Sequence, residues 1–380
     1  MSLLFTQPHY QELHQRRLAL LDQHKQALLS AFPSLTNTPN ETELNHALWL
    51  LQRQRGVTGS NIATLMGLNK WQTPYQLWAQ YTTLEQAPLS SEQEERFAWG
   101  HRLEPVIAAA YAERLHVNVQ AVPLMQSNAY PFLLASLDRV VLDSEGKPCK
   151  VLEVKTASRN YTSDDEDENG LALQAWGRGN VYSRDGTLLE KDCQVPKTYY
   201  LQVMHYMLVS GIHSADIAVL LNGNDLRIFS IDYDEELAAD IVTCADEFWC
   251  RHVLDNQAPR MVESDAKTLV PAPGKSVEAT NLIKEQFVEL KTIDAQLNEL
   301  KDKRQALRDA ITSFIGDSEC LVADGEKLAT YKMQRGRASF DSVRFKADHP
   351  ELYDSYMKEG EPFRVLRSSR AKSNKGNKSN

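Results

Sequence analysis

The stretch "VLEVKTAS", Val151 to Ser158, decides the predicted fold, because it reads as a buried strand that nevertheless carries two charges. Side chains alternate along a strand, so Glu153 and Lys155 project from one face while Leu152 and Val154 point to the other. A charge on a buried face is costly unless it is paired or binds a metal. Taken alone, the pattern favours an ion pair on a half-exposed strand. The surrounding motifs decide whether it is more than that.

Three strand-like runs surround this stretch: "VNVQAVPL" (117–124), "FLLASLDRVVLD" (132–143) and "CKVLEVKT" (149–156). The turn "DSEGK" (143–147) predicts that the last two form an antiparallel hairpin. We then expect Asp138 within a residue or two of the point opposite Glu153, although a register slip would turn it to the other face. A surface ion pair between Asp138 and Arg139 is the alternative.

A long helix is expected from Ser91, with Glu94 completing a capping box. Glu104 falls within its apolar stripe, and Gly100, one turn earlier, would allow close approach of a neighbouring element. The alternative is a glutamate at the edge of the core whose carboxylate reaches water. The residues expected to share the stripe are Phe97, His101, Glu104, Ala108, Tyr111 and Leu115.

The apolar helix "VPKTYYLQVMHYMLVSGI" (195–212) carries one strongly polar side chain, Gln202, on a face shared with Tyr199, Tyr206 and Val209. A buried amide needs hydrogen-bond partners, so Gln202 is a candidate site residue. The alternative is an ordinary core helix.

Asp138, Glu153 and Lys155 together form a D…ExK constellation that Glu104 would approach from its helix. Converging carboxylates repel one another unless a divalent cation neutralises them, and hard oxygen ligands select Mg²⁺ or Mn²⁺. The Lys155 ammonium could then orient and polarise an attacking water. These groups are suited to the hydrolysis of a phosphodiester.

Composition sets limits on the class of protein. The 380 residues include 42% hydrophobic ones and carry a net charge of −9, which does not by itself indicate nucleic-acid binding. No apolar run of about 18 residues predicts a membrane span, and the N-terminus lacks the pattern of a secretory signal. The five cysteines are scattered, which favours a reducing compartment and argues against a zinc or iron–sulfur cluster. We therefore expect a cytoplasmic protein with no membrane association.

The order of elements predicts an α/β fold with a mixed sheet flanked by helices and a C-terminal appendage. N-terminal helices over residues 9–32 and 41–54 dominate residues 1–52, and the core spans 53–262. Residues 263–275, with "PAPG" at 271–274, are the expected linker. Residues 276–363 are expected to hold a long helix, able to pair as a short coiled coil, and a small β region. A basic disordered tail, 364–380, contrasts with the acidic run "DDEDE" at 164–168.

Five motifs together are specific: "RQRGVTGSNIA", "WGHRLEP", "LASLDR", "LEVKT" and "YYLQVMHYM". With these, the chain from about residue 53 to 232 resembles the lambda-exonuclease (YqaJ-type) branch of the PD-(D/E)xK nucleases. The resemblance implies a restriction-endonuclease-like core that holds two Mg²⁺ ions, for which Mn²⁺ can substitute. The implied metal ligands are Asp138, Glu153 and the backbone carbonyl of Val154, with Glu104 as the helix carboxylate. Lys155 would be the catalytic lysine.

The same resemblance implies a pocket for a 5′ phosphate. Arg53 and Ser60 match the pair of residues that binds this phosphate in the family, and Ser136 matches a serine of the same pocket. Gln202 and Tyr199 match the motif on the helix behind the metals. Ser60 could instead merely cap its helix, with Arg53 in solvent.

The expected function is a Mg²⁺-dependent 5′-to-3′ exonuclease on double-stranded DNA ends that leaves 3′ single strands for recombination. The resemblance further implies a ring-shaped homotrimer that needs no ATP and works beside a single-strand annealing protein in a phage or mobile element. The alternatives are a structure-specific or nicking endonuclease on the same core, and a DNA-binding recombination accessory with an inert site.

Overall fold

The computed structural model describes residues 3–31, 38–83, 90–157, 176–268, 276–336, 339–358 and 364–366. The chain divides into two compact units, Met1–Ala266 and Lys267–Asn380. The first unit contains the predicted core and all of the candidate site residues. The acidic run at 164–168 and the "PAPG" segment at 271–274 lie outside the described residues.

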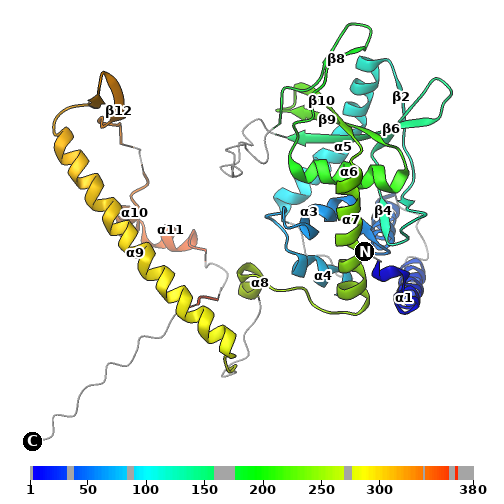
Figure 1. The fold of residues 1–380 in the computed structure, drawn as a ribbon, viewed down its shortest axis with the longest axis horizontal. Helices are drawn as coiled ribbons and strands as arrows, with labels where there is room; N and C mark the ends of the chain where they lie inside the picture. The colour runs from blue at the N-terminus through cyan, green and yellow to red at the C-terminus, as the bar shows by residue number, and fades with distance from the viewer. Residues whose placement is uncertain are drawn as a thin grey trace, which may run out of the picture. The chain divides into compact units, whose positions relative to one another are not determined.

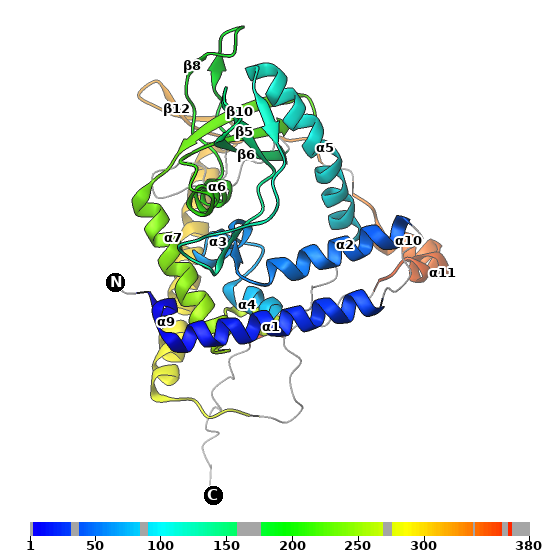
Figure 2. The ribbon, with the colours of Figure 1, turned by 90° about the vertical axis from the view of Figure 1, so that its right-hand side faces the viewer.

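The first unit contains the helices expected over residues 9–32 and 41–54, from Ser91 and over 195–212, together with further ones (Figure 1). Thr58 caps α3 in a capping box with Asn61, and Thr73 caps α4, where Pro74 takes the first position. Figure 2 shows α1 and α2 running side by side. The helices are η1 (Leu4–Thr6), α1 (Pro8–Ala31), α2 (Thr38–Arg53), α3 (Gly59–Leu65), α4 (Pro74–Thr83), α5 (Ser91–Leu115), α6 (Lys197–Ser210), α7 (Glu235–Glu247), the π-helix η2 (Phe248–Leu254) and α8 (Glu263–Thr268).

A five-stranded mixed sheet in the order β10-β9-β6-β5-β2 forms the centre of this unit. Its strands are β2 (Asn118–Gln120), β5 (Arg139–Leu142), β6 (Pro148–Ala157), β9 (Ser214–Leu221) and β10 (Asp225–Asp232). The β5–β6 hairpin is antiparallel, and its turn is closed by hydrogen bonds between Asp143, Gly146 and Lys147. Strand β6 pairs in parallel with β9, which α6 makes possible by crossing between them.

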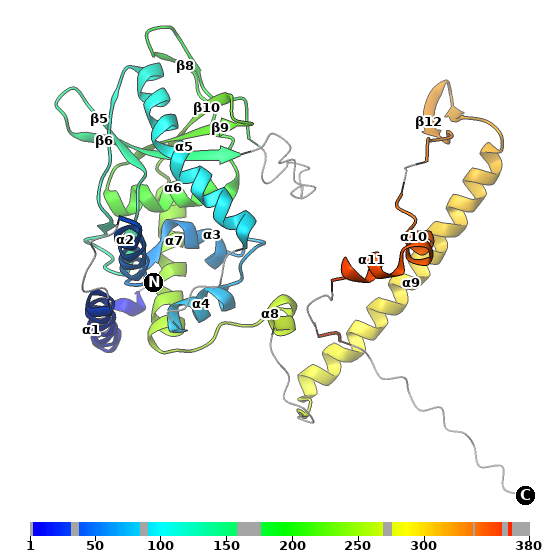
Figure 3. The same cartoon turned by 180° about the vertical axis from the view of Figure 1, so that it is seen from behind.

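The two faces of β6 pack against different helices, as the alternation in its sequence predicts. Leu152 and Val154 join a cluster with Ile107 and Tyr111 of α5. Val151 belongs instead to the larger cluster that contains the buried side of α6. Helix α5 lies behind the sheet in Figure 1 and in front of it in Figure 3. Glu153 and Lys155 therefore face the α6 side.

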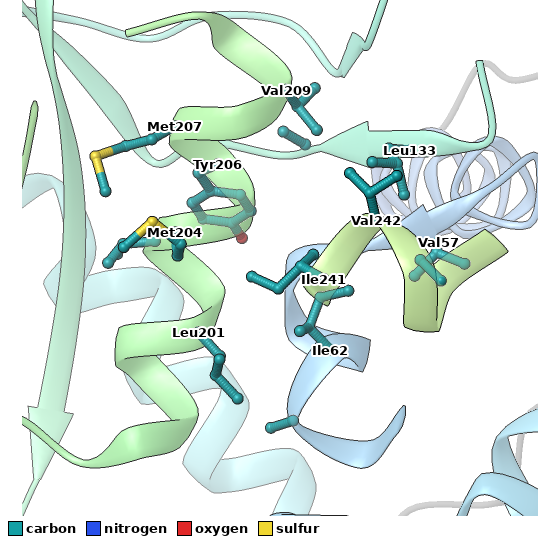
Figure 4. Close-up of a cluster of buried hydrophobic side chains, with 14 of the residues drawn as sticks. Val57, Ile62, Leu133, Leu201, Met204, Tyr206, Met207, Val209, Ile241 and Val242 are labelled. Atoms are coloured by element: carbon teal, nitrogen blue, oxygen red, sulfur yellow. The ribbon is translucent and has the colours of Figure 1, made fainter. Parts of the chain in front are cut away.

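Helix α6 is the centre of the larger core (Figure 4). It is apolar on most of its circumference, with Met204, Met207 and Tyr206 buried, because it packs against the sheet, α3 and α7 together. Ile62 of α3 and Ile241 of α7 meet it from the other side. This packing fixes the height and rotation of Gln202 above the sheet.

A smaller sheet, β1-β4-β3, positions the loop between α2 and α3. Its strands are β1 (Val57–Thr58), β3 (Met125–Gln126) and β4 (Leu133–Ala135). The Val57 amide donates to the Phe132 carbonyl at 2.7 Å, and a Cβ on Gly56 would stand 2.6 Å from that oxygen. Only glycine fits there, so "RGVTG" is held tightly against β4.

Helix α5 differs from expectation at its N-terminal end. The capping box is formed by Ser90 and Gln93, one residue before the expected pair. Phe97 and His101 are exposed, and a Cβ on Gly100 would meet nothing within 4 Å. The inference that Gly100 allows close packing is therefore wrong. The stripe is covered only from Leu103 onward, where the helix reaches the sheet.

Between β6 and α6, the described residues contain a short hairpin of β7 (Val181–Tyr182) and β8 (Leu188–Glu190), which was not predicted. The expected linker also differs. Its first residues form α8, where Asp265 is fully buried and accepts a hydrogen bond from the Thr73 hydroxyl at 2.6 Å. The first part of this helix thus belongs to the first unit, because a buried carboxylate needs such partners.

The second unit contains the expected long helix and small β region, α9 (Asn281–Ile315) and the hairpin of β11 (Cys320–Ala323) and β12 (Glu326–Thr330). Two short helices, α10 (Ser342–Asp348) and α11 (Pro350–Ser355), were not predicted. Of the basic tail, the structure describes residues 364–366. Across the described part of the chain, no helix combines the length and apolarity that a membrane crossing requires.

Candidate active site

Glu153 is the centre of the candidate site. Its side chain is 1% exposed, and its Oε1 atom receives two donors. One is the Lys155 ammonium from the same face of β6, and the other is Gln202 Nε2 on α6, at 2.8 Å. The second N–H of Gln202 donates to the Tyr206 hydroxyl, also at 2.8 Å. The one polar side chain of the apolar helix thus orients the buried carboxylate.

The other oxygen of Glu153 is different, since Oε2 is buried without a hydrogen-bond partner among the described residues. Burial raises the pKa of Glu153 to about 8, against the opposing effect of Lys155 and with a further upward contribution from Asp138. Uncompensated buried acceptors are rare in folded proteins, so this oxygen needs an explanation. A bound cation would supply the missing partner.

Asp216, a second buried carboxylate in the same sheet, provides a comparison on the α5 face. It accepts hydrogen bonds from Tyr111 and Ser230 at 2.6 Å each, and Lys150 Nζ lies 3.0 Å from it. Its oxygens are fully supplied with donors from the chain. A carboxylate with a structural role looks like this, and Glu153 does not.

Asp138 lies where the hairpin predicted it. Arg139 pairs with Leu152, so Asp138 and Glu153 are one step further along the two strands. Its Oδ2 accepts a hydrogen bond from the Val154 amide at 2.8 Å. This bond fixes Asp138 beside the Glu153–Lys155 segment.

The charge of Lys155 is set by competing effects. Burial lowers the pKa of its ammonium, but the Glu153 and Asp138 carboxylates outweigh that effect and the net shift is upward. Its Nζ also lies 5.2 Å from the centre of the Tyr199 ring, within the range of a cation–π contact. Lys155 is therefore held as a cation between β6 and α6.

Glu104 does not join these carboxylates directly. Its Oε1 atom accepts a hydrogen bond at 2.6 Å from Arg139, which also donates to the backbone carbonyl of Asp138. Glu104 is thus connected to the cluster through Arg139, and Arg139 does not form the surface pair with the Asp138 carboxylate that was the alternative.

The residues present fit a hard divalent cation in chemical type. The carboxylates of Asp138 and Glu153 and the carbonyl of Val154 are oxygen donors of the kind that Mg²⁺ prefers, and the unpartnered Glu153 oxygen is among them. Within the described ranges, no three histidine, cysteine or acidic side chains gather closely enough to hold a metal by themselves. The donor set therefore consists of two carboxylates and a carbonyl, with Glu104 drawn away by Arg139.

The predicted phosphate-binding pair is also in contact. Arg53 Nη2 donates to Ser60 Oγ at 2.8 Å and to Thr58 Oγ1 at 3.1 Å, and its guanidinium lies 4.6 Å from the centre of the Trp49 ring. Ser60 lies in the first turn of α3. Ser136 lies half-buried between β4 and β5. Arg53 is thus held beside the start of a helix, where backbone N–H groups are available to an anion.

Two adjoining hollows lie between the predicted phosphate-binding residues and the side chains of α6. One, of about 240 Å³, has Ser60, Gln202 and Tyr199 in its wall together with Lys70 and Trp71. The other, of about 620 Å³, shares Trp71 and Tyr199. It adds Arg96 of α5, Thr156 of β6 and Trp176, whose ring stacks on Tyr199 with a centre-to-centre distance of 5.5 Å. Ser60 and Gln202, predicted from separate motifs, therefore share a pocket.

Sequence reasoning missed Lys70, Trp71, Arg96 and Trp176 as candidate site residues. The signal for Trp71 was available, because "LNKWQTP" sets a tryptophan among polar residues in a loop, and its side chain is 78% exposed. A large exposed aromatic residue beside a lysine is typical of a binding surface. Trp176 gave no such signal, since it follows directly on residues outside the described part of the chain.

Residues 48–213 match the model of the YqaJ-like viral recombinase domain. The chain carries a YqaJ-like domain. That match contains Arg53, Ser60, Glu104, Asp138, Glu153, Lys155 and Gln202, whose contacts are described above. The YqaJ-type resemblance predicted from the five motifs is thus confirmed for the domain over residues 48–213.

Similar proteins cover different shares of the chain. The uncharacterized protein YqaJ of Bacillus subtilis (strain 168) is 27% identical over 328 residues, which span 84% of this chain and 92% of that protein. An alkaline exonuclease from Laribacter hongkongensis (LHK-Exo) is 18% identical with a TM-score of 0.38, over 55% of this chain and 92% of that one. A phage-related exonuclease from Haemophilus somnus 129PT is 11% identical with a TM-score of 0.33, over 53% of this chain and 96% of that one.

Proposed function

We propose that the protein is a Mg²⁺-dependent 5′-to-3′ exonuclease on double-stranded DNA, with its site on a PD-(D/E)xK core. The observation that carries the proposal is the unpartnered, buried oxygen of Glu153 beside Asp138 and Lys155. A binding protein with an inert site has no physical reason to keep a buried acceptor without a donor, because that arrangement costs about 1–3 kcal/mol.

The metal would be held by Asp138, Glu153 and the Val154 carbonyl, and when bound it would neutralise the phosphate and help to activate water. The chain's own residues have separate tasks. Lys155, kept as a cation, would hold the attacking water and stabilise negative charge on the phosphoryl oxygens. Gln202 keeps Glu153 in one rotamer by donating to the oxygen that Lys155 also contacts. Arg139 connects Glu104 to the backbone carbonyl of Asp138 and leaves it outside the donor set.

The DNA end would occupy the two adjoining hollows. Arg53, Ser60 and the start of α3 would bind the terminal 5′ phosphate, since an arginine fork and free amide groups both favour an anion. Lys70 and Arg96 would contact further phosphates, and the exposed face of Trp71 offers a surface for base stacking. Ser136 would belong to the same pocket.

The same proposal includes a cytoplasmic, ring-shaped homotrimer that works beside a single-strand annealing protein in a phage or mobile element. Its support is the resemblance stated for the five motifs. Mn²⁺ would replace Mg²⁺, because both accept the same oxygen donors.

The deciding experiment gives the pure protein an end-labelled linear duplex and covalently closed circles, each with Mg²⁺ and with Mg²⁺ plus EDTA. We expect progressive loss of one strand of the linear DNA from its 5′ end, no cutting of circles, and no reaction with EDTA. Cutting of closed circles would instead identify the endonuclease alternative. Binding of both substrates without any cleavage would identify the accessory protein.

A further inference from the structure

The described residues of the second unit leave an apolar stripe of its long helix α9 exposed. Among the residues that the structure describes in this helix, Ile315 alone is buried. Leu297 is 49% exposed and Leu300 is 59% exposed, at the middle of the 35 residues. A helix of this length spans about 50 Å, and an uncovered apolar stripe over that distance calls for a partner.

The stripe follows a strict seven-residue repeat. Starting from Ile283, every seventh residue is Leu290, Leu297, Arg304 and Ile311, which are the a positions. A seven-residue repeat, in which apolar residues alternate at spacings of three and four, is the pattern of a left-handed coiled coil, in which one helix pairs with another along its length.

The d positions complete the seam. They begin at Gln286 and continue with Ile293, Leu300, Leu307 and Phe314. All four of these apolar side chains are exposed, Phe314 at 80%. The a and d positions together form the seam, along which two paired helices would meet. Two of its residues, Gln286 and Arg304, are polar, and their partners differ between a parallel and an antiparallel pair.

Charge decides against a parallel pair of identical helices. In a parallel coiled coil each g residue faces the e residue of the next heptad on its partner. That arrangement would bring Glu289 against Asp294 and Lys303 against Arg308, each pair twice, with Arg304 facing its own copy inside the seam. All of these are contacts between like charges, which destabilise.

An antiparallel pair removes every one of those conflicts. With Leu297 of one helix opposite Leu300 of the other at the centre, a positions face d positions, so Arg304 lies against Ile293 and Gln286 against Ile311. In this orientation e faces e, which brings Asp294 beside Lys301 twice. It also brings Arg308 beside the Phe287 ring, a favourable cation–π arrangement.

We propose that α9 is a homotypic assembly element that pairs antiparallel with α9 of a second copy of this chain. The seam supplies apolar burial along the whole helix, and the flanking charges select the antiparallel orientation. The pairing is independent of the nuclease proposal, because no residue of the candidate active site takes part in it.

The test uses the full-length protein and its mass in solution by sedimentation velocity over a dilution series. Leu297→Glu places a charge at the centre of the seam and should lower the weight-average mass by about half, whatever the first unit forms by itself. Because Leu297 is exposed within one chain, this variant should keep its fold, which circular dichroism checks. An unchanged mass would overturn the proposal.

Orientation is tested by reversing one charge at a time. Asp294→Lys should weaken association about tenfold, because it faces Lys301 of the second copy twice, and Asp294→Lys with Lys301→Asp should restore it. In a parallel pair Asp294→Lys would strengthen association instead, since the new lysine would attract Glu289 of the second copy. The matched control is Asp302→Lys on the outer face, which should leave the mass unchanged. Stronger association of Asp294→Lys would refute the antiparallel arrangement.

Discussion

Lys155 is the residue on which the two explanations of the D…ExK pattern differ most. As a structural ion pair it would only neutralise Glu153, whereas in catalysis it acts on the substrate. Its position beside Asp138, Glu153 and the Tyr199 ring leaves the ammonium at the junction of β6 and α6, next to the hollow that Tyr199 lines.

We predict that Lys155→Ala lowers single-turnover cleavage of linear duplex about 10²-fold or more while duplex affinity changes little. Asp138→Asn and Glu153→Gln should act in the same way. The matched control is Lys147→Ala, in the exposed turn of the β5–β6 hairpin, which should leave cleavage unchanged. If Lys155→Ala keeps more than about a tenth of the activity, the lysine has no part in the reaction.

Arg53 should distinguish DNA ends. A terminal 5′ phosphate carries more charge than an internal one, so the pocket of Arg53 and Ser60 should make digestion of 5′-phosphorylated ends faster than that of 5′-hydroxyl ends. In Arg53→Ala the difference should shrink sharply, and Arg53→Lys should not restore it, since lysine lacks the fork. Equal single-turnover rates on both ends in the wild type would rule the pocket out.

His205 makes stability depend on pH. Its Nε2 lies 3.0 Å from the Leu134 carbonyl, and burial lowers its pKa from 6.5 to about 4. Burial also lowers the pKa of His14 to about 4, with a smaller effect from Arg17. Because the unfolded chain takes up protons first, the stabilisation is complete above pH 6.5 and is lost as the pH falls toward 4.

Between about pH 7 and pH 5, each histidine should therefore cost about 2 kcal/mol of unfolding free energy. His205→Gln keeps a donor for Leu134 but cannot titrate, so its loss on acidification should be smaller than that of the wild type by this amount. Urea unfolding at the two pH values measures it. Identical losses in both proteins would mean that His205 is not the group responsible.

At the scale of elements, the contact of α3 with α6 links the phosphate pocket to the carboxylate site. Gly59 starts α3, and a Cβ there would stand 2.5 Å from Tyr206 Cε1 and 3.1 Å from the Gln202 carbonyl. Tyr206 in turn accepts a hydrogen bond from Gln202. A change at this glycine should thus reach Glu153 through two side chains.

We predict that Gly59→Ala destabilises the protein by about 1–3 kcal/mol and also slows cleavage, because the side chains must shift. Gly100→Ala is the matched control in open space on α5, and it should stabilise by about 0.5–1 kcal/mol, since alanine suits a helix interior better. Thermal unfolding of both variants measures the expected loss of stability in Gly59→Ala and the expected gain in Gly100→Ala. A neutral Gly59→Ala would show that α6 has room to move.

The sequence predicts these elements well where the signal is local. Thr73 and Pro74 mark the start of α4, and "DSEGK" marks the hairpin whose register placed Asp138 opposite Glu153. The sequence predicts elements poorly where contacts between residues far apart in the chain determine the structure. The short strands β1 and β3 exist only because β4 lies between them, and the open surroundings of Gly100 depend on how far α5 extends beyond the sheet.

The candidate site shows the same division. Strand alternation put Glu153 and Lys155 on one face, and helix periodicity marked Gln202 as a candidate, because both signals are local. The contact between Gln202 and Glu153 could not be read from these patterns, because it joins two elements that are distant in sequence. The ion pair between Glu104 and Arg139 could not either, because α5 and β5 are joined by no local pattern. Trp71 could be recognised as a candidate site residue only once its exposure was known.

At the scale of the whole molecule, α8 determines where the first unit ends. Asp265 is buried, accepts from the Thr73 hydroxyl and accepts from the Val262 amide at 2.9 Å. A protein ending at Thr268 keeps these bonds, whereas one ending at Arg260 loses them.

We predict that the protein ending at Thr268 folds, unfolds in one transition and retains cleavage of linear duplex. The one ending at Arg260 should be less stable by about 2 kcal/mol, because Thr73 loses a charged acceptor. Denaturant unfolding and the cleavage assay measure both. If the protein ending at Thr268 is insoluble or inactive, the two units do not fold separately.

Strand β6 pairs with β5 over Pro148–Leu152 and with β9 over Val151–Ala157, and helices pack against both of its faces. Its amide hydrogens should therefore exchange with solvent only when the entire sheet opens, whereas those of the β7–β8 hairpin exchange by local fluctuation. Fraying at the periphery then leaves Glu153 and Lys155 in place. Heat should inactivate this protein at the temperature where its core melts, with no earlier loss from a loosened site.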